Sequence, residues 1–504
     1  MRAAWWLALP AGGLSVLAFS PFDLFPLAFV SLGVLFALLR RARSTRQGAL
    51  IGFAWGMGAF LCGVSWLYVA LNRYGGVPMP LAALAIALFC AYLSLFPALV
   101  GALFSHWRTG GRYADAVLFA AVWMLAELGR GWVFTGFPWL SIGYTQTPPS
   151  PFAGYFPLLG VYGVSALVGV VSALAVTCWR GGRRSAWIGG GLVTLTMILG
   201  AGLARVAWTE AEGEPIRVAL LQTAIEQDLK WRPDLVQEWL RVNAAMAAAP
   251  EADLIVLPET SLPMLVEHLP EGYLDLLAAD ARVRSADLVV GVFHRDEQGR
   301  IYNAAVSLGQ APSQFYAKHH LVPFGEFSPP LFGWFYEFAD IPMSDQSPGP
   351  AVQAPMALAG QRVAINICYE DLFGRELIRT LPEATLMLNL SNLAWYGRSL
   401  AQPQHLQIAR VRAIETGRPM LRSTNTGMTA VIQPDGRVAG VLPQFERGAL
   451  EVEVRGYTGM TPYARLGDFP ALALGLLGLL GGLAGRRHAS HPARASFAPE
   501  RESQ

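Results

Sequence analysis

The sequence has few charged residues and no strong net charge. Only 15% of its 504 residues are charged, 53% are hydrophobic, and the formal net charge at pH 7 is +2. This composition is too apolar for an ordinary soluble protein, so we expect a chain that lies largely in a lipid bilayer. The low net charge, with no Lys/Arg-rich run on any polar segment, argues against a nucleic-acid partner.

Lysine is nearly absent from the chain. It occurs only at Lys230 and Lys318, and every other cationic residue is arginine. In a chain so poor in lysine, Lys318 suggests a position that needs an ammonium group. Lysine and arginine are not interchangeable where a compact point charge is required.

Cysteine is also scarce, with Cys62, Cys90, Cys178 and Cys368 as the four examples. These residues form no CxxC pair and no metal-ligand spacing, and the chain has no nucleotide-binding motif. We therefore expect no metal and no cofactor. The first three cysteines lie in long apolar runs, which leaves Cys368 without a disulfide partner in its own part of the sequence.

Long apolar runs fill residues 1–205, and one more lies within residues 464–487. Runs of about 20 residues suffice to cross the hydrocarbon of a bilayer, so we predict eight membrane spans. The first has the look of a signal peptide but lacks a small-residue cleavage site, and we interpret it as an anchor. The predicted spans are 3–19, 24–39, 48–70, 80–104, 114–130, 160–179, 187–205 and 468–485.

The positions of arginine predict the orientation of these spans. Arginines follow the second, fourth and sixth spans and are rare in the intervening loops. By the positive-inside rule the three arginine-bearing loops, both chain termini and the tail from Arg486 are cytoplasmic. We thus expect a multi-pass protein of a bacterial inner (plasma) membrane, with the segment between spans seven and eight in the periplasm. The arginines are Arg40, Arg41, Arg43, Arg46, Arg108, Arg112, Arg180, Arg183 and Arg184.

Residues 213–458 have a different composition, with interspersed charges and short β-rich runs. Helical patterns at 233–249 and 405–415 separate some of these runs, which favours an α/β domain. We expect the polar tail, residues 488–504, to be disordered and cytoplasmic. The predicted strands are 216–222, 254–258, 288–292, 304–308, 363–368 and 386–389.

Cys368 ends one of these predicted strands and precedes a segment, 372–376, that resembles the start of a helix. A thiol at a strand-to-helix turn lies at the edge of a sheet, and a helix N-terminus favours its thiolate form. The alternative is a small buried apolar residue, the commoner fate of a free cysteine. In the oxidising periplasm an unpaired thiol needs a functional reason.

Two further segments carry groups that complement a nucleophilic thiol. Glu259 ends the strand at 254–258, and the segment 316–326 contains Lys318 and Glu326. Acyl transfer to a thiol needs a base and a cation or N–H donor that stabilises the oxyanion. Taken singly, Glu259 could cap a helix and Lys318 could be a solvated surface charge. His319 and His320 are read either as a general base or as loop residues.

In this order, the three segments resemble the nitrilase superfamily with its Glu-Lys-Cys triad. Such a domain between seven preceding spans and one following span resembles the apolipoprotein N-acyltransferase family. The resemblance also covers the Arg-Gly-Trp loop at 130–139 and the run 422–427. It implies a multi-domain fold: an eight-span transmembrane helical bundle with an extracytoplasmic α-β-β-α sandwich.

The resemblance also implies an activity: transfer of an acyl chain from a phospholipid to the N-terminal diacylglyceryl-cysteine of an apolipoprotein, through a cysteine thioester. Cys368 would be the nucleophile, Glu259 the general base and Lys318 the oxyanion stabiliser. Supporting or substrate-binding residues would be Glu326, Tyr369, Glu370, Trp231, Phe324 and Trp395. One departure is visible, because Leu393 replaces an aspartate common in the family.

Aromatic side chains beside the polar site suggest a lipid substrate. The segment 329–338 is rich in aromatics, and we expect it to rest on the membrane as a lid, with Trp395 and Tyr396 on the same apolar rim. The alternative is a loop packed on the core of its own domain. For the tryptophans of the loop 129–139 we favour positions in an interfacial belt over a role in lipid access.

Two other functions remain open. A membrane-tethered amidase or hydrolase would use the same triad and let water take the acyl group. A transporter would use the outer domain as a binding module, but it would need buried charges along a path through its spans. Asp23, Glu127 and Arg130 instead lie near span ends, which disfavours a transporter.

Overall fold

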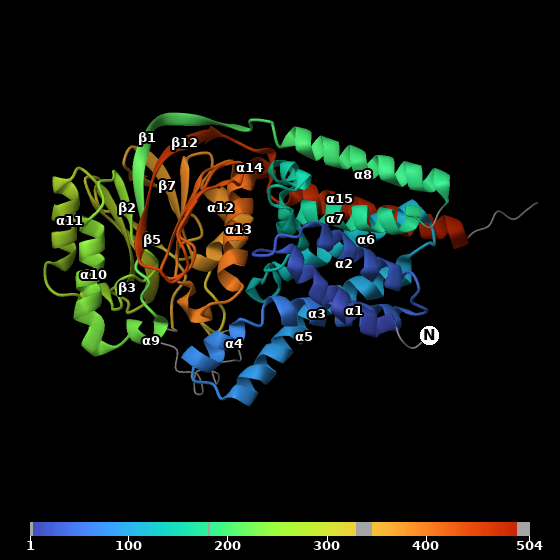
Figure 1. Ribbon diagram of the computed structural model, residues 1–504, viewed down its shortest axis with the longest axis horizontal. Coiled ribbons are helices and arrows are strands. Elements are labelled where there is room, and N and C mark those ends of the chain that lie inside the picture. Colours follow the sequence, from blue (N-terminus) through green and yellow to red (C-terminus); the bar gives the residue numbers. More distant parts are fainter. Residues whose placement is uncertain (1–3, 180–181, 329–344, 491–504) are drawn as a thin grey trace, which may run out of the picture.

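The computed structural model describes residues 4–179, 182–328 and 345–490 (Figure 1). A helical region lies beside an α/β sandwich, and the chain passes from the first to the second along the long strand β1 and returns along β12. The predicted lid, 329–338, lies outside the described residues. Of the predicted disordered tail, residues 488–490 continue a helix, and 491–504 are outside the described residues.

Within the described residues, each of the eight predicted spans is largely helical, and the third is interrupted between α3 and α4. By length and composition, α5, α7 with the preceding turn, and α8 can each cross a membrane, and the pair α3 and α4, bent by 61°, would make a fourth. The helices α1, α2 and α15 are apolar but have shorter apolar stretches. The bounds are α1 Ala4–Ser15, α2 Pro26–Leu39, α3 Thr45–Gly63, α4 Leu67–Val69, α5 Met79–Trp107, α6 Arg112–Arg130, α7 Phe156–Trp179, α8 Arg183–Leu203 and α15 Phe469–Ser490.

Glycine allows the close packing of the helical region. A Cβ atom at Gly58 of α3 would lie 1.9 Å from the carbonyl oxygen of Leu9 in α1, and one at Gly52 would lie 2.0 Å from that of Pro97 in α5. Without a hydrophobic driving force between helices in lipid, such backbone contacts are a main source of attraction. The glycines of α3 therefore hold this helix between α1 and α5.

The α/β domain consists of two six-stranded sheets, with the orders β12-β1-β2-β3-β4-β5 and β11-β10-β9-β8-β7-β6. The pairs β1/β2, β2/β3, β7/β8 and β8/β9 are parallel, so the ends of these strands point to one edge of each sheet. The bounds are β1 Thr209–Gln222, β2 Leu254–Val256, β3 Asp287–Arg295, β4 Ile301–Gly309, β5 Phe315–Ala317, β6 Met356–Leu358, β7 Gln361–Ile367, β8 Leu386–Ser391, β9 Met420–Thr424, β10 Ala430–Ile432, β11 Val438–Val441 and β12 Gly448–Gly459.

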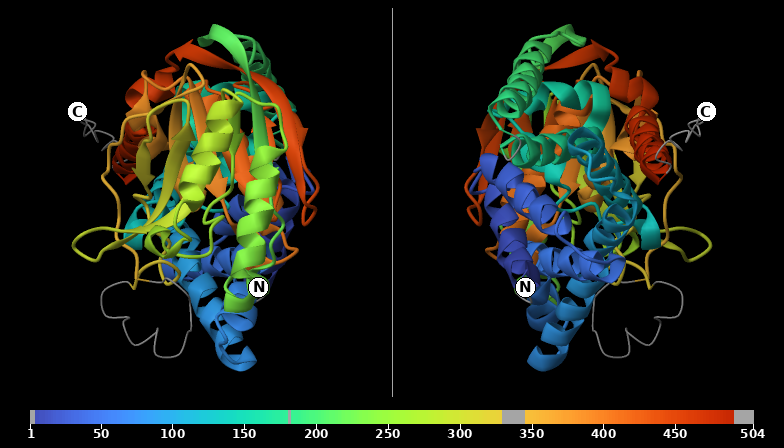
Figure 2. Two further views of the ribbon diagram at one scale, coloured as in Figure 1. Left: turned by 90° about the vertical axis from the view of Figure 1, so that its left-hand side faces the viewer. Right: turned by 90° about the vertical axis from the view of Figure 1, so that its right-hand side faces the viewer.

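Alternate residues of facing strands form the core between the two sheets. Val218 and Leu220 of β1 meet Ile365 and Ile367 of β7 in this apolar layer, as the two-residue period of a strand requires. Helices cover both outer faces, which gives the predicted α-β-β-α sandwich (Figure 1), and the left view of Figure 2 looks onto the helices outside the first sheet. Those helices are α9 Gln227–Lys230, α10 Val236–Ala248, α11 Tyr273–Val283, α12 Gly374–Leu377 and α13 Ala401–Thr416, and α14 Pro462–Leu466 leads back to the helical region.

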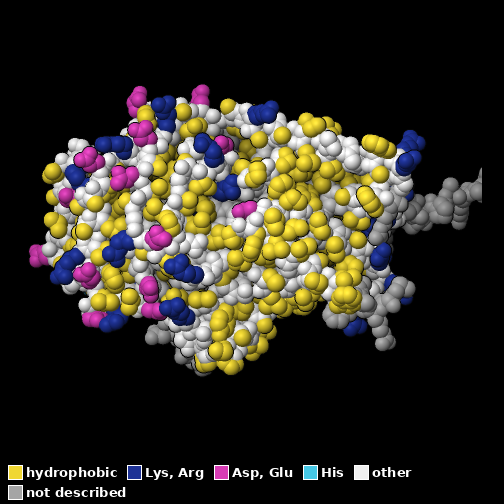
Figure 3. Space-filling model, viewed as in Figure 1, with side chains coloured by type: hydrophobic (Ala, Val, Ile, Leu, Met, Phe, Trp, Pro, Cys, Tyr) yellow, Lys and Arg dark blue, Asp and Glu magenta, His cyan; other side chains and the backbone are white. Residues whose placement is uncertain are grey.

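Helix α13 is covered on both sides. Ala409 and Ala413 pack in the core under the second sheet, whereas Ile408 and Val411 belong to the core of the helical region. Figure 3 shows charged side chains spread over the sandwich and at the far end of the helical region, with a largely apolar surface between them. This band is the surface that a bilayer would cover.

Candidate active site

Glu259, Lys318 and Cys368 lie just beyond the ends of three strands. Glu259 follows β2 and Lys318 follows β5, both in the first sheet, and Cys368 follows β7 in the second. Since the sheets face each other, these ends bring the three side chains to one place. The ammonium of Lys318 interacts electrostatically with both Glu259 and the thiol of Cys368.

Lys318 is completely enclosed. Its side chain is 1% exposed, and Nζ lies 2.6 Å from Oε1 of Glu326 and 3.4 Å from Oε1 of Glu259. Burial alone would lower the pKa of Lys318, but the carboxylates of Glu326 and Glu259 outweigh this effect and raise it above the ordinary value. The ammonium therefore stays charged, and the alternative of a solvated surface lysine is wrong.

Glu259 is fixed by two donors besides Lys318. The side-chain amide of Asn303 donates to Oε1 at 2.8 Å, and the backbone N–H of Asn392 donates to Oε2 at 2.6 Å. The residue is 5% exposed and caps no helix, so the capping alternative is also wrong. A carboxylate held at both oxygens keeps a single orientation toward its neighbours.

Cys368 occupies a strained backbone position. Its φ is +52°, in the left-handed region that non-glycine residues seldom adopt. The carbonyl oxygen of Cys368 accepts a hydrogen bond of 3.1 Å from Nδ2 of Asn389. A sharp turn of this kind directs the side chain of the residue away from the strand that precedes it.

The thiol of Cys368 is not stabilised as a thiolate in the resting protein. Burial raises its pKa, Glu259 raises it further, and Lys318 lowers it by less, so the pKa lies well above its usual range. The helix expected to start within 372–376 is α12, but it has only four residues, and the 3-10 turn Cys368–Leu372 separates it from the thiol. A thiol with a raised pKa needs a base nearby if it is to act as a nucleophile.

Glu370 anchors two segments of the site to each other. Its carboxylate accepts hydrogen bonds from the backbone N–H groups of Ile367, His319 and His320 at 2.6, 2.7 and 3.1 Å. The hydroxyl of Tyr316 donates to it at 2.9 Å. Glu370 thus ties the turn that carries the nucleophile to the strand end that carries Lys318.

The rings of His319 and His320 point to other partners. Nδ1 of His319 lies 2.8 Å from the carbonyl oxygen of Gly349, and Nδ1 of His320 lies 3.1 Å from Glu376. These contacts support the interpretation of both histidines as loop residues rather than as a general base. Their backbone N–H groups, not their rings, contribute to the site by donating hydrogen bonds to Glu370.

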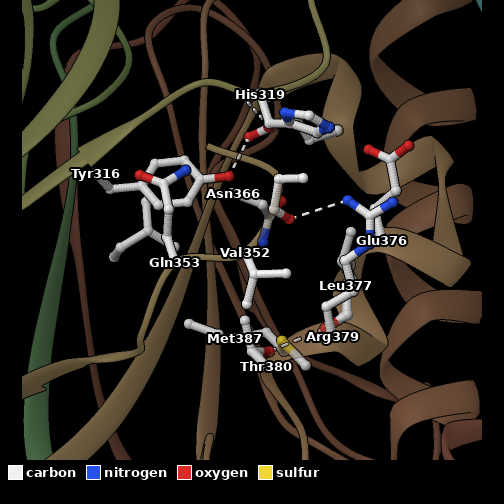
Figure 4. A pocket seen from close by; sticks show the side chains of 14 residues that line it. Tyr316, His319, Val352, Gln353, Asn366, Glu376, Leu377, Arg379, Thr380 and Met387 are labelled. Atoms are coloured by element: carbon white, nitrogen blue, oxygen red, sulfur yellow. Dashed lines mark hydrogen bonds between the residues drawn. The ribbon is translucent and has the colours of Figure 1, made fainter. Parts of the chain in front are cut away.

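A cavity of about 40 Å³ lies beside Glu370. Figure 4 shows Tyr316 and Gln353 on one side of it and Glu376 and Arg379 on the other. None of Glu259, Lys318 and Cys368 lines this cavity. Its size suits one or two water molecules rather than a lipid.

The loop after α6 reaches the nucleophile turn. The hydroxyl of Tyr369 donates a hydrogen bond of 2.8 Å to the carbonyl oxygen of Gly136. Trp139 is 3% exposed and donates from Nε1 to Gln404, so its predicted place in an interfacial belt is wrong. Trp132, by contrast, is 58% exposed.

Trp231, Phe324 and Trp395 are partly exposed. Trp231 follows α9 and packs against Phe293, with 5.9 Å between ring centroids. Phe324 has a φ of +63°, two residues before Glu326. The ring centroid of Trp395 lies 5.9 Å from that of Tyr74, the last residue of the helical segment Leu67–Tyr74. All three were predicted from the sequence as supporting residues, and that role stays a prediction.

Several residues that support the site were not predicted from the sequence. Asn303 and Asn392 donate to Glu259, and Asn389 donates to the carbonyl oxygen of Cys368, but single asparagines in strands and loops carry no recognisable pattern. Leu393, the departure from the family pattern, is 1% exposed. The neighbouring Asn392 side chain accepts from the N–H of Ala394, so the turn is capped without an aspartate at 393.

Family comparisons cover both parts of the chain. The profile described as "Apolipoprotein N-acyltransferase N-terminal domain" matches residues 11–174, and "Carbon-nitrogen hydrolase" matches residues 217–463. Among solved structures, a carbon-nitrogen hydrolase from Helicobacter pylori G27 is similar at 17% identity and a TM-score of 0.36, over 47% of this chain and 88% of that one.

Curated relatives match along nearly their whole length. The apolipoprotein N-acyltransferase of Nitrosomonas europaea is 48% identical over 95% of this chain and 98% of its own. The apolipoprotein N-acyltransferase of Ralstonia nicotianae is 42% identical over 97% of this chain and 95% of its own. Together with the two domain matches, these similarities show that the chain belongs to the apolipoprotein N-acyltransferase family, with an acyltransferase domain of nitrilase-superfamily fold.

Proposed function

We propose that Cys368 carries an acyl chain from a phospholipid to the α-amine of the N-terminal diacylglyceryl-cysteine of an apolipoprotein. Glu259 is the general base, Lys318 stabilises the oxyanion, and Glu326 holds Lys318. The observation that carries this assignment is the enclosed Lys318 ammonium, in contact with two carboxylates and in electrostatic range of the Cys368 thiol. Such a preorganised cation is what a developing oxyanion needs.

In the first half-reaction Glu259 takes the proton of the thiol as sulfur attacks the ester carbonyl of the phospholipid. The oxyanion of the tetrahedral intermediate is held by Lys318 and by the backbone N–H of Tyr369. The C–O bond then breaks, and the lysophospholipid leaves with the proton from Glu259. The raised pKa of the thiol supports this order, because little thiolate exists before substrate arrives.

In the second half-reaction the free amine of the acceptor attacks the thioester. A C–N bond forms, the C–S bond breaks, and Glu259 transfers the amine proton to the departing thiolate. Hydrolysis requires water at the same carbonyl, so apolar neighbours favour transfer. Tyr396, which interacts with the thiol and packs 4.6 Å from Trp66 of the helical region, supplies such a neighbour.

We further propose that the helices of all eight predicted spans, including α6, lie in the bacterial inner membrane, with the sandwich in the periplasm and both termini in the cytoplasm. Three arginine-bearing loops meet at one end of the helical region. Arg108 donates to the carbonyl oxygens of Arg40 and Ala42, and Arg112 donates to Ser185 at 3.0 Å. A cluster of cations at that end supports its cytoplasmic position.

The intact mass of the purified protein after exposure to phospholipid tests the reaction. Wild type should gain one acyl chain, removable by hydroxylamine and mapped to Cys368, and should lose it to a diacylglyceryl-peptide. Cys368→Ser should gain none, whereas Cys62→Ser, which changes an exposed cysteine, should behave as wild type. Rapid release of free fatty acid without an acceptor would instead show a hydrolase. Retention of wild-type acylation by Cys368→Ser would refute the assignment.

A further inference from the structure

Three buried side chains form a closed ring of hydrogen bonds beneath the nucleophile turn. Nε2 of His405 lies 2.6 Å from Oδ1 of Asp371, and Nη1 of Arg422 lies 2.9 Å from Oδ2 of the same carboxylate. Nη2 of Arg422 lies 2.7 Å from Nδ1 of His405. Each of the three side chains is at most 1% exposed, so water screens none of these interactions.

The ring admits only one protonation state of His405. A guanidinium can donate hydrogen bonds but cannot accept them, so Nδ1 of His405 must be the unprotonated acceptor of Arg422. Nε2 then carries the only ring proton and donates it to Asp371. Burial and the charge of Arg422 lower the pKa of His405, in agreement with a neutral imidazole.

The ring is connected to the nucleophile at two points. Asp371 belongs to the same turn, Cys368–Leu372, as the nucleophile. Arg422 also donates from Nη1 to Oδ1 of Asn389 at 3.2 Å, and Nδ2 of Asn389 donates to the carbonyl oxygen of Cys368. The strained backbone at Cys368 is therefore fixed by the hydrogen bond to its carbonyl oxygen and by the hydrogen bonds of Asp371, three residues further along the same turn.

His405 also faces the helical region. It lies on α13, and its ring centroid is 5.3 Å from that of Trp139 in the loop after α6. The charged groups that face it are Asp371 from the nucleophile turn and Arg422 from β9, with Glu259 at longer range. His405 thus links the ring to the helical region through its contact with Trp139.

We propose that neutral His405 is a positioning residue for acyl transfer: it fixes Asp371 and Arg422, and through Asn389 it holds the Cys368 turn in its strained conformation. This proposal rests on the proposed function of Cys368. His405 does not touch the reacting atoms. Its contribution is to the placement of sulfur against the ester carbonyl, for which small displacements are costly.

The experiment compares two substitutions of His405 in the full-length protein. His405→Phe keeps a ring but removes both hydrogen bonds, whereas His405→Gln retains a neutral N–H donor for Asp371. Acyl-enzyme formation from phospholipid should slow by about tenfold to 100-fold in His405→Phe, with KM for phospholipid within about twofold, since misplacement affects kcat. His405→Gln should recover a large part of the rate.

A control on the same helix separates positioning from folding. Gln407 is equally buried, and its Oε1 accepts a hydrogen bond from the backbone N–H of Ser20 in the helical region. Gln407→Leu should therefore lower the thermal unfolding temperature without slowing acylation. Asn389→Ala removes the link from Arg422 to the carbonyl oxygen of Cys368, together with the contacts of Asn389 to Asn366 and Ser391, and leaves His405 in place. It should reproduce the slowing even if His405→Phe fails to fold. Wild-type acylation rates in folded His405→Phe or in Asn389→Ala would overturn the proposal. If Cys368→Ala still acylated the acceptor, the proposed function itself would fail.

Discussion

The hydroxyl of Tyr369 and the carbonyl oxygen of Gly136 form a hydrogen bond that joins the residue after the nucleophile to the loop after α6. Gly136 has a φ of +94°, a conformation that favours glycine. The bond lies between segments 233 residues apart in the sequence. It is a direct connection between the helical region and the turn that carries Cys368.

Tyr369→Phe should lower both stability and activity. The substitution leaves a buried carbonyl oxygen without its donor, which costs about 1–3 kcal/mol. Thermal unfolding in detergent should show a lower Tm, and the rate of acyl-enzyme formation should fall. Tyr113→Phe, at a position 44% exposed, is the control. An unchanged Tm would show that Gly136 finds another donor.

Glu326→Gln should reduce kcat/KM for acyl transfer by about tenfold or more, on the scale of a lost charge-assisted hydrogen bond. It removes the carboxylate nearest to the Lys318 ammonium, so the pKa of Lys318 falls and the ammonium loses its fixed position. Steady-state transfer to a diacylglyceryl-peptide measures the effect. Glu297→Gln, a surface substitution with the same change in charge, should leave kcat/KM unchanged.

Alkylation of Cys368 by iodoacetamide should report the charges around the thiol. Because Glu259 raises the pKa of the thiol and Lys318 lowers it, Glu259→Gln should shift the alkylation profile to lower pH and Lys318→Met should shift it to higher pH. Both variants should nevertheless lose acyl transfer. The background should carry serine at Cys62, Cys90 and Cys178. Shifts in the opposite directions would contradict the geometry.

The stability of the protein should decline as the pH falls below the ordinary pKa of histidine, about 6.5. The fold lowers the pKa of His405, so the unfolded chain binds the proton more readily. The stability that neutral His405 contributes is present above about pH 6.5 and is lost as the pH falls toward the folded-state pKa. Chemical unfolding at pH 7.5 and 5.5 should show a smaller loss for His405→Gln than for wild type. Equal losses would exclude His405 as the titrating group.

The sequence predicted the strands that lead to the site better than it predicted the contacts within the site. β2, β7 and β8 overlap predicted runs because buried parallel strands are short and continuously apolar, and the predicted runs 288–292 and 304–308 lie within the longer strands β3 and β4. β1 begins at Thr209, seven residues before the predicted start, because its first half pairs only with β12 and is largely exposed. Periodicity alone could not reveal such a two-stranded extension.

The ring of Asp371, His405 and Arg422 could not be predicted from the sequence. A helix with one buried face shows an apolar stripe, but α13 is buried nearly all round and its polar residues face partners on both sides. Its sequence therefore resembles that of an exposed helix. Only the contacts between distant segments show that His405 and Arg412 lie in the interior.

The double burial of α13 has a practical consequence for dissecting this enzyme. Excision of residues 206–461 would leave Arg412 and Glu415 of α13 without Tyr144 and the backbone N–H of Val161, their partners in the helical region. The apolar side chains of α13 that pack against the helical region would be exposed to water at the same time. The hydrolase-like half should accordingly precipitate when it is produced alone.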